Sequence, residues 1–145
     1  MYENIDLSAK FDNFKNVYLM EKHRIDSYKK WPFNDNFPCS VVKMAEAGFF
    51  WSGNDKENDT ATCFVCQKTL HGWESTDNPW KEHAKHAPQC QFVKYGRKEK
   101  DLLLEEFLVI FGIIYKSKMQ REINRIREVF KAEVSDELEN FRTQK

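Results

Sequence analysis

The sequence predicts a small α+β domain of short helices and strands, followed by one long C-terminal helix. Two observations support this division. All four prolines and all four cysteines lie within the first 90 of the 145 residues. From Arg97 to the end there is a single glycine, Gly112, and no proline, while helix-favouring and charged residues dominate. We therefore expect an N-terminal segment at residues 1–15, a folded domain at 16–95, and a linker with a long helix at 96–145.

Short elements are expected in the first half, and each has a local signal. A helix is expected over residues 16–30, ending before a Trp-Pro pair. A second helix is expected at 40–47, where Ser40 is the capping residue and a glycine follows the last turn. A third is expected at 78–87, with an Asn-Pro start and a proline after its end. Runs of aromatic and β-branched residues predict short strands at 49–51, 62–64 and 68–73.

Composition excludes several classes of protein. The chain has 23 basic and 23 acidic residues, so it lacks the charge of a generic nucleic-acid binder or a polybasic membrane anchor. With 32% charged residues, it is not expected to be an integral membrane protein. The first ten residues contain no apolar run, so no secretory signal is expected. The thiols of a chain that is not exported stay reduced, which favours metal ligation over disulfides.

The strongest chemical signal is the spacing C-x2-C-x16-H-x6-C. Cys63 and Cys66 are close enough to hold one ion from a tight turn, and His83 and Cys90 complete a tetrahedron. Three cysteines and one histidine form a closed structural zinc set, which argues against metal catalysis. His86 is an alternative histidine ligand, because H-x3-C is also a workable spacing. The alternative is that these residues bind no metal, and that they are simply cysteines of the core and one histidine on the surface.

Together with neighbouring motifs, this spacing resembles the baculoviral inhibitor-of-apoptosis repeat (BIR) family over about residues 19–93. The other motifs are His23-Arg24-Ile25, Trp31-Pro32-Phe33, Met44-Ala45-Glu46-Ala47-Gly48-Phe49 and Gly72-Trp73-Glu74. The resemblance implies a three-stranded antiparallel sheet with short helices around one zinc ion, and it selects His83 as the ligand. It also implies a buried structural role for Arg24 and core positions for Trp31, Phe33 and Phe49.

Members of this family with a single repeat and a long helix bind the free N-terminus of a phosphorylated histone tail. The resemblance implies that Leu70 and Trp73 wall the pocket and that Asp77 holds the peptide ammonium. It implies that Lys68 and His86 meet the phosphate. Without the resemblance, such residues are ordinary solvated charges, a core tryptophan, a helix cap and an exposed histidine.

Acidic groups near the same groove are matched by Glu57 and Glu82. At one position where the family has an amine-binding acid, this chain has His71. A histidine cannot anchor an ammonium, but it can meet a phosphate, more strongly once protonated. The peptide-binding set is therefore expected to include His71, with weaker capture of the amine.

The start of the long helix is apolar on nearly every face over residues 102–115, which predicts burial on several sides. The resemblance implies a homodimer contact at Leu104, Phe107, Leu108 and Ile110. Packing back onto the repeat is the alternative, and both can hold at once.

Further along, apolar residues recur with a mean spacing of about 3.7, which favours a nearly straight or slightly right-handed bundle. This stripe consists of Met119, Ile123, Ile126, Phe130, Val134, Leu138 and Phe141. The resemblance implies that it packs with helices of borealin and the inner centromere protein, and so positions an Aurora-type kinase. A self-associating coil is the alternative.

The resemblance implies a non-enzymatic adaptor of the chromosomal passenger complex, acting in mitosis and cytokinesis, without direct DNA or membrane binding. Its expected locations are the nucleus, the chromosomes and centromeres, the spindle midzone and the cytoplasm. The alternative is an apoptosis inhibitor that binds caspases or the N-termini of their antagonists. A ubiquitin ligase would need a second zinc module, for which no cysteines remain. A hydrolase would need a base beside Cys39, which is expected instead to be a small buried side chain.

Overall fold

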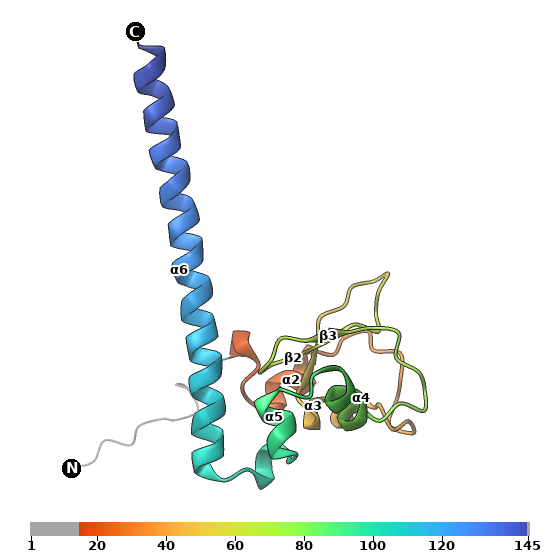
Figure 1. Cartoon of the computed structure of the whole chain (residues 1–145). Helices are drawn as coiled ribbons and strands as arrows, with labels where there is room; N and C mark the ends of the chain where they lie inside the picture. The colour runs from red at the N-terminus through yellow and green to blue at the C-terminus, as the bar shows by residue number, and fades with distance from the viewer. Residues whose placement is uncertain (1–14, 145) are drawn as a thin grey trace, which may run out of the picture. The chain divides into compact units, whose positions relative to one another are not determined.

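The computed structural model describes residues 15–144, and the chain divides into two compact units (Figure 1). The first unit ends at Phe111 and the second begins at Gly112. The first contains a sheet and several short helices, whereas the second consists of the rest of one long helix. Apart from Lys15, the N-terminal segment predicted at residues 1–15 lies outside the described residues.

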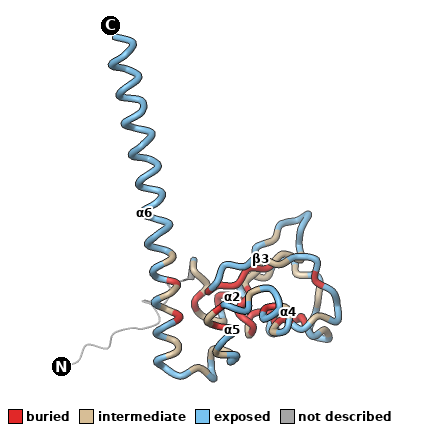
Figure 2. Tube along the Cα trace, in the orientation of Figure 1, coloured by how far each residue is buried: buried red, intermediate tan, exposed pale blue. Residues whose placement is uncertain are grey.

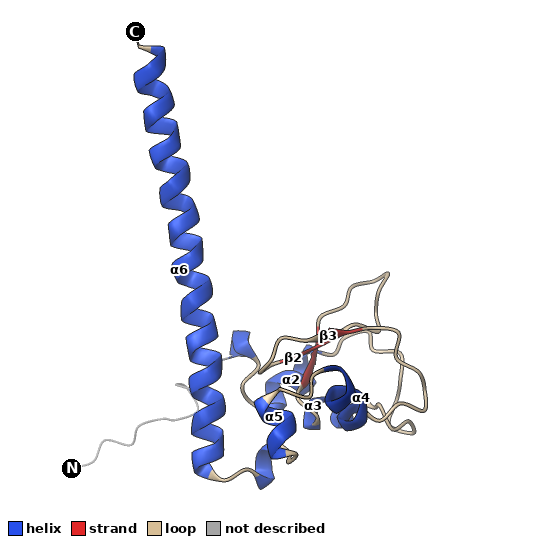
Figure 3. Ribbon diagram, viewed as in Figure 1, coloured by secondary structure: helices blue, strands red, loops and turns tan. Residues whose placement is uncertain are grey.

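A three-stranded antiparallel sheet forms the centre of the first unit (Figure 3). Its strands are β1 (Phe49–Trp51), β2 (Ala61–Cys63) and β3 (Thr69–Leu70), in that order across the sheet. The α+β fold class and the sheet are therefore confirmed. The third strand is shorter than predicted because Gly72 turns the chain away with a φ of 73°. The Gly72 amide donates to the carboxylate of Asp59 at 2.8 Å instead of continuing a ladder.

The two edges of this sheet differ. On the β1 edge, Ser27 Oγ accepts the amide of Trp51 at 2.8 Å, and the Tyr28 hydroxyl donates to the Phe49 carbonyl at 3.1 Å. These bonds occupy the backbone groups that another strand would need. Among the described residues, no strand pairs with the outer side of β3. The sheet therefore has one closed edge and one open edge.

Four short α-helices and two 3-10 turns accompany the sheet. They are η1 (Lys15–Val17), α2 (Glu21–Ser27), α3 (Val41–Glu46), α4 (Pro79–His86), α5 (Gln91–Tyr95) and η2 (Glu99–Asp101). The predicted start of α4 is confirmed, since the Asn78 side chain accepts the Lys81 amide at 3.1 Å. Ser40 precedes α3 as predicted, but its side chain makes no capping hydrogen bond, so the predicted capping role is wrong. Helix α5 was not predicted.

The helix predicted over residues 16–30 is wrong at both ends, since α2 covers only Glu21–Ser27. Tyr18 adopts a φ of 55°, which breaks the helix between η1 and α2, and its ring stacks on Phe50 with centroids 3.9 Å apart. The carbonyls of Tyr18 and Leu19 accept hydrogen bonds from Arg24 at 3.0 and 2.9 Å. The side chain of Arg24, and not a helical backbone, therefore supplies the hydrogen-bond donors for these two carbonyls.

Arg24 is fully buried and connects α2 with α3 and with the segment after α5. Its Nε donates to the Ala45 carbonyl at 3.0 Å, and its guanidinium carbon lies 4.1 Å from the centre of the Phe64 ring. One carboxylate oxygen of Glu99 lies 3.7 Å from Nη2. Burial lowers the pKa of Arg24 to about 10, so the side chain still carries its charge at neutral pH. The predicted buried structural role is confirmed.

An aromatic cluster makes up much of the core, and Figure 2 shows the buried segments gathered around the sheet and the helices of the first unit. Phe49 is fully buried and lies edge-on to Trp73, with ring centroids 5.4 Å apart. Trp31 contacts both Trp73 and Phe33 edge-to-face, at 6.1 and 5.8 Å. The core position predicted for Phe49 is confirmed, whereas Trp31 and Phe33 are only half-buried.

The long helix α6 (Leu104–Thr143) begins later than predicted and runs through Gly112 without a break. Its start is fixed by Glu106, whose carboxylate accepts the Leu103 amide at 2.9 Å in a capping-box arrangement. Glu106 also pairs with Arg97, in the segment that was expected to be helical. No helix among the described residues is long and apolar enough to cross a membrane.

Replacing Arg24 with alanine should destabilise the first unit by about 3 kcal/mol or more, because three backbone carbonyls, two of them in buried hydrogen bonds, would lose a charged donor. Urea unfolding followed by tryptophan fluorescence measures this, since all four tryptophans lie in the first unit. Lys43→Ala removes only an exposed ion pair with Glu46 and should leave the unfolding midpoint unchanged. Equal effects of the two substitutions would contradict the structural role of Arg24.

Candidate metal centre and adjoining groove

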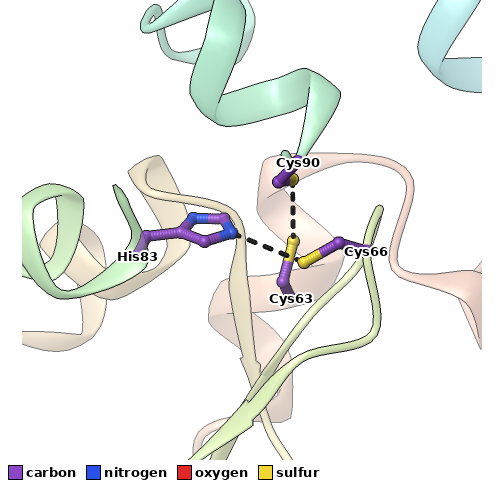
Figure 4. A group of neighbouring side chains, drawn as sticks. All are labelled: Cys63, Cys66, His83 and Cys90. Atoms are coloured by element: carbon purple, nitrogen blue, oxygen red, sulfur yellow. Dashed lines mark hydrogen bonds between the residues drawn. The ribbon is translucent and has the colours of Figure 1, made fainter. Parts of the chain in front are cut away.

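The four residues predicted as metal ligands meet at one point (Figure 4). Cys63 ends β2, Cys66 lies in the turn that follows, His83 is in α4, and Cys90 directly precedes α5. Their ligand atoms all lie within 4.8 Å of one another. Cys63 Sγ is 3.9 Å from Cys90 Sγ, and Cys66 Sγ is 3.7 Å from His83 Nε2. The structure thus brings His83 to the cysteines, and His86 is not part of this group.

A tight backbone turn holds the first two thiols on the same side. The Gln67 amide donates to the Cys63 carbonyl at 3.0 Å, and the Cys63 amide donates to the Lys68 carbonyl at 2.9 Å. Gln67 adopts a φ of 62°, which lets the chain reverse within these few residues. The Val65 amide also donates to Cys63 Sγ at 3.3 Å, a contact that favours the thiolate form required of a metal ligand.

The orientation of His83 is fixed by its other ring nitrogen. His83 is fully buried, and its Nδ1 lies 2.8 Å from the Ala47 carbonyl. Because a carbonyl can only accept a hydrogen bond, Nδ1 carries a proton, and Nε2, the nitrogen that would bind a metal ion, faces the sulfurs. The Phe49 ring, with its centroid 4.7 Å away, covers one side of the imidazole.

The spacing of these atoms fits a single tetrahedral metal ion. Metal–sulfur bonds of about 2.3 Å and metal–nitrogen bonds of about 2.0 Å give tetrahedral edges of about 3.8 Å between sulfurs and 3.5 Å between sulfur and nitrogen. The observed separations of 3.9 and 3.7 Å are close to these values. All four positions are taken by protein atoms, so the arrangement is that of a structural site.

Proton binding opposes metal binding in this cluster. Burial raises the pKa of Cys63 well above its usual value. Burial disfavours a charge on His83, but its hydrogen bonds to Cys66 and Cys90 outweigh this and raise its pKa to about 9. Without metal, these groups hold protons at neutral pH, and a metal ion has to displace them. Metal affinity should therefore fall as the pH falls.

The fourth cysteine lies outside the cluster. Cys39 is fully buried, and its Sγ lies 3.4 Å from the Glu74 carbonyl. Burial raises the pKa of Cys39, so it stays a neutral thiol. This agrees with the predicted role as a small buried side chain.

Beside the metal centre, β3, the loop after it and one side of α4 enclose a groove of about 380 Å³. All seven side chains predicted for peptide binding line it, together with Thr69 and Gly72: Lys68, Leu70, His71, Trp73, Asp77, Glu82 and His86. The groove therefore lies along the open edge of the sheet. Glu57 is not among the lining residues, and the peptide-binding role of the others stays a prediction.

Several supporting contacts could not be predicted from the sequence. The Ala47 carbonyl that orients His83 is a backbone group, which no residue-type pattern reveals. The bond from Asp59 to the Gly72 amide shapes the groove loop. Gly72 itself was part of a recognised motif, and its left-handed backbone gives the physical reason for that glycine.

The predicted helix surfaces are exposed to different degrees. The seven stripe residues are all exposed, Val134 least at 42% and Phe141 most at 68%. Leu104 and Leu108 are exposed at 74% and 57% and are available for the predicted dimer contact. Phe107 is half-buried. Ile110 is only 1% exposed and packs within the first unit. This agrees with the alternative interpretation, in which the start of the helix packs back onto the repeat.

Comparisons with known proteins agree with the geometry. Residues 24–94 match the family described as Inhibitor of Apoptosis domain, BIR. Baculoviral IAP repeat-containing protein 5 of Rattus norvegicus is 40% identical over 114 residues, which cover 79% of this chain and 80% of the relative. The Mus musculus protein of the same name is also 40% identical, over 79% of this chain and 81% of its own length. Baculoviral IAP repeat-containing protein 5.2 of Xenopus tropicalis is 38% identical, over 77% and 72%.

The purified chain should contain one metal ion, and a strong chelator should unfold the first unit, since ligation contributes on the order of 10 kcal/mol. His83→Ala and Cys90→Ser should lose the metal and the cooperative unfolding transition. Cys39→Ser is the matched control, because it changes a buried cysteine outside the cluster, and it should keep one ion per chain. Elemental analysis and tryptophan fluorescence measure both effects. Metal retained in Cys90→Ser, or lost in Cys39→Ser, would contradict the assignment.

Proposed function

The chain belongs to the BIR family of inhibitor-of-apoptosis proteins, and from that membership we propose that it is a non-enzymatic adaptor of the chromosomal passenger complex. In this proposal, the groove binds the phosphorylated N-terminal tail of a histone. Helix α6 binds borealin-like and inner centromere protein-like helices, and through them the chain targets an Aurora-type kinase in mitosis and cytokinesis. Its locations are then the nucleus, the chromosomes and centromeres, the spindle midzone and the cytoplasm.

One observation carries the proposal: the seven residues expected to bind a peptide all line a single groove along the open outer edge of β3. An extended peptide can pair its backbone with the open edge of β3 while its first residues enter the groove. Leu70 and Trp73 offer apolar walls, and Asp77 offers a carboxylate. Lys68 and His86 offer donors for a phosphate.

The proposed cofactor is one zinc ion, held by Cys63, Cys66, His83 and Cys90. Three thiolates and one imidazole in a tetrahedral arrangement are typical of structural zinc. Its role would be structural, because one ion would crosslink the segments that carry the four ligands. Because no coordination position is left for water or substrate, the site supports a binding protein and not an enzyme.

The proposed partner surface is the stripe on α6. A helix with large exposed apolar residues on one face needs a partner that covers them. The near-straight course of the stripe suits a bundle of parallel rods more than a tightly wound heptad zipper. Acidic residues Glu133, Asp136 and Glu137 flank Phe130 and Phe141, so a partner helix with basic residues fits this end. Without partners, Leu104 and Leu108 are the proposed homodimer contacts.

The second candidate function is inhibition of apoptosis, which the description of the matching family favours. The same groove would then bind a caspase or the exposed N-terminus of an antagonist. Such a ligand needs a free ammonium but no phosphate, so peptide binding separates the two candidates.

Fluorescence polarisation with labelled histone-tail peptides tests the groove. We expect the phosphorylated peptide to bind at least about tenfold more tightly than the unphosphorylated one, because a charge-assisted contact contributes about 1.5–3 kcal/mol. Lys68→Ala should reduce this preference, whereas Lys94→Ala, an exposed lysine outside the groove, should not. Equal or undetectable binding of both peptides would remove the histone-reader proposal. Tight binding of an unphosphorylated antagonist N-terminus instead would favour the second candidate.

The single substitutions Ile126→Glu and Phe130→Glu should each abolish assembly with borealin-like and inner centromere protein-like helices. Each would place a charge in the stripe that the partner covers. Arg121→Glu is the control, because it changes the charge on the opposite side of the same helix. All three variants should keep their metal and the fluorescence of the first unit. Size-exclusion chromatography of the mixed chains measures assembly, and an unchanged complex in the stripe variants would contradict the proposed surface.

A further inference from the structure

From Lys118 to Gln144 every residue of α6 is exposed, and Figure 2 shows this length of the helix as exposed throughout. The stripe from Met119 to Phe141 lies within it, so its large apolar side chains face water unless another chain covers them. The charged residues along the two borders of the stripe indicate which chain suits it.

The two borders of the stripe carry opposite charges. Successive residues of an α-helix are turned by about 100°, and this places acidic residues along one border and basic residues along the other. The acidic border consists of Glu122, Glu133 and Glu137, and the basic border consists of Arg127, Lys131 and Arg142. The other charged residues between Met119 and Thr143 lie further round the helix: Arg121, Arg125, Glu128, Asp136 and Glu139.

On the acidic side, the structure has a groove of about 580 Å³ in which carboxylates adjoin the stripe. Its lining consists of Phe130, Val134, Leu138 and Phe141 from the stripe, together with Glu133, Asp136 and Glu137. A helix that covers the stripe would therefore meet these carboxylates at its own border.

The border charges are accessible to a second chain. Glu122 pairs with Arg125 at 2.6 Å and Lys131 with Glu128 at 3.1 Å, but both pairs are exposed and join residues of one helix. Pairs of this kind contribute little, so they do not prevent contacts with another chain. Among the described residues, none forms an ion pair or a side-chain hydrogen bond with the other four border residues: Glu133, Glu137, Arg127 and Arg142.

Borders of opposite charge distinguish the two ways in which two copies of this helix can pair. In a parallel pair, the acidic border of each copy faces the basic border of the other. In an antiparallel pair, acidic faces acidic and basic faces basic. Flanking charges set the orientation of paired helices, and like charges across an interface are unfavourable. The pattern therefore favours a parallel pair.

We propose that the stripe of α6 pairs with the stripe of a second copy of this chain, parallel and in register, when no other partner covers it. Glu122 then faces Arg127 of the second copy, and Glu137 faces Arg142 of the second copy. Both pairs have a separation of five positions in the sequence, so one register satisfies both. A parallel pair also brings together the starts of the two helices, where homodimer contacts are already proposed.

This inference concerns the chain without the partner helices of the proposed function, and it does not depend on that function. It uses the same stripe, so partner helices and a second copy compete for one face of α6. Partner helices that bind should therefore displace the second copy.

Single cysteines in the full-length, metal-loaded chain report the orientation of the pair. With oxidised glutathione, Phe141→Cys should form a disulfide-linked dimer, because a parallel pair places the two ends of the stripe side by side. In an antiparallel pair, residue 141 lies opposite residue 119, about 33 Å from its counterpart, and only a mixture with Met119→Cys would be linked. Arg121→Cys, on the opposite side of the helix, and the untreated sequence are the controls, and non-reducing gel electrophoresis measures the linked dimer.

Charge reversals test the two borders, each in the Phe141→Cys chain. Glu122→Lys with Glu137→Lys makes both borders basic, and Arg127→Glu with Arg142→Glu makes both acidic. The chain concentration needed for half-maximal linkage should rise at least about tenfold in either double variant. An equimolar mixture of the two, one carrying a larger tag, should link mainly as the heterodimer, and 1 M salt should remove that preference.

The matched control for these reversals is Glu128→Lys with Glu139→Lys, which changes the same charges on the side of α6 away from the stripe. It should link at the same chain concentration as Phe141→Cys alone. All variants should keep one metal ion and the tryptophan fluorescence of the first unit, so a failure of that unit to fold is detected separately.

The outcomes separate this inference from the proposed function. Linkage of Phe141→Cys no greater than in the controls, or only with Met119→Cys, overturns the parallel pair. Charge variants that link like the matched control, without preference for the heterodimer, overturn the recognition by border charges. Borealin-like and inner centromere protein-like helices that bind but leave the linkage unchanged overturn the stripe as the paired surface. None of these results contradicts the adaptor, and a failure of those helices to bind contradicts only the adaptor.

Discussion

The convergence of three thiols and one imidazole is the constraint on which the first unit depends. Its strands are two or three residues long, and its helices have at most eight residues, so backbone pairing alone cannot hold them. A metal ion bound by these four residues would join β2, the turn after it, α4 and the start of α5, and the hydrogen bond from His83 to the Ala47 carbonyl adds the end of α3. The same crosslink shapes the groove: Glu82 adjoins the ligand His83 on α4, and Lys68 follows the ligand Cys66 by two residues. If the groove binds a peptide as proposed, metal binding and peptide binding would therefore be coupled through the positions of two side chains.

Ion pairs and hydrogen bonds of charged side chains hold together the parts of the first unit that carry no metal ligand. Arg24 bonds to three backbone carbonyls from inside the core, and Glu99 balances its charge while also accepting the amide of Glu21. Nearby, Lys98 pairs with Glu46 at 3.0 Å. Burial disfavours charge on Glu46, but its hydrogen bonds to Lys98 and Lys43 prevail and lower its pKa. Ion pairs thus fasten the segment between α5 and α6 to the domain, at a place where the sequence offers few apolar residues.

What could be predicted depended on whether a feature is encoded by residue type or by packing. The metal ligands and the α4 start are encoded by type and spacing. The choice between His83 and His86 came from the family resemblance, because both histidines have a workable spacing to Cys90. The break at Tyr18 could not be predicted, because it depends on stacking with Phe50 and on backbone carbonyls that accept hydrogen bonds from the side chain of Arg24. The start of α6 could not be predicted from the sequence, because the residue at its capping position is Leu103, and leucine is a poor capping residue.

Large apolar residues are mostly buried in the first unit and mostly exposed in the second, and this difference suits the proposed adaptor function. In the first unit, Phe49, Phe92 and Met44 are fully buried, so its surface is free to present a small groove of mixed charge. The second unit is the rest of one helix, and its large apolar residues from Met119 onward stay exposed, although Ile114 near its start is buried. A helix in water gains little stability from helix propensity alone, and most of its stability comes from the apolar face that it buries. We therefore expect a second chain to stabilise this part of the helix, whereas the groove belongs to a unit with a core of its own. Such a chain can hold a ligand with a preformed site and acquire its assembly surface only when a partner is present.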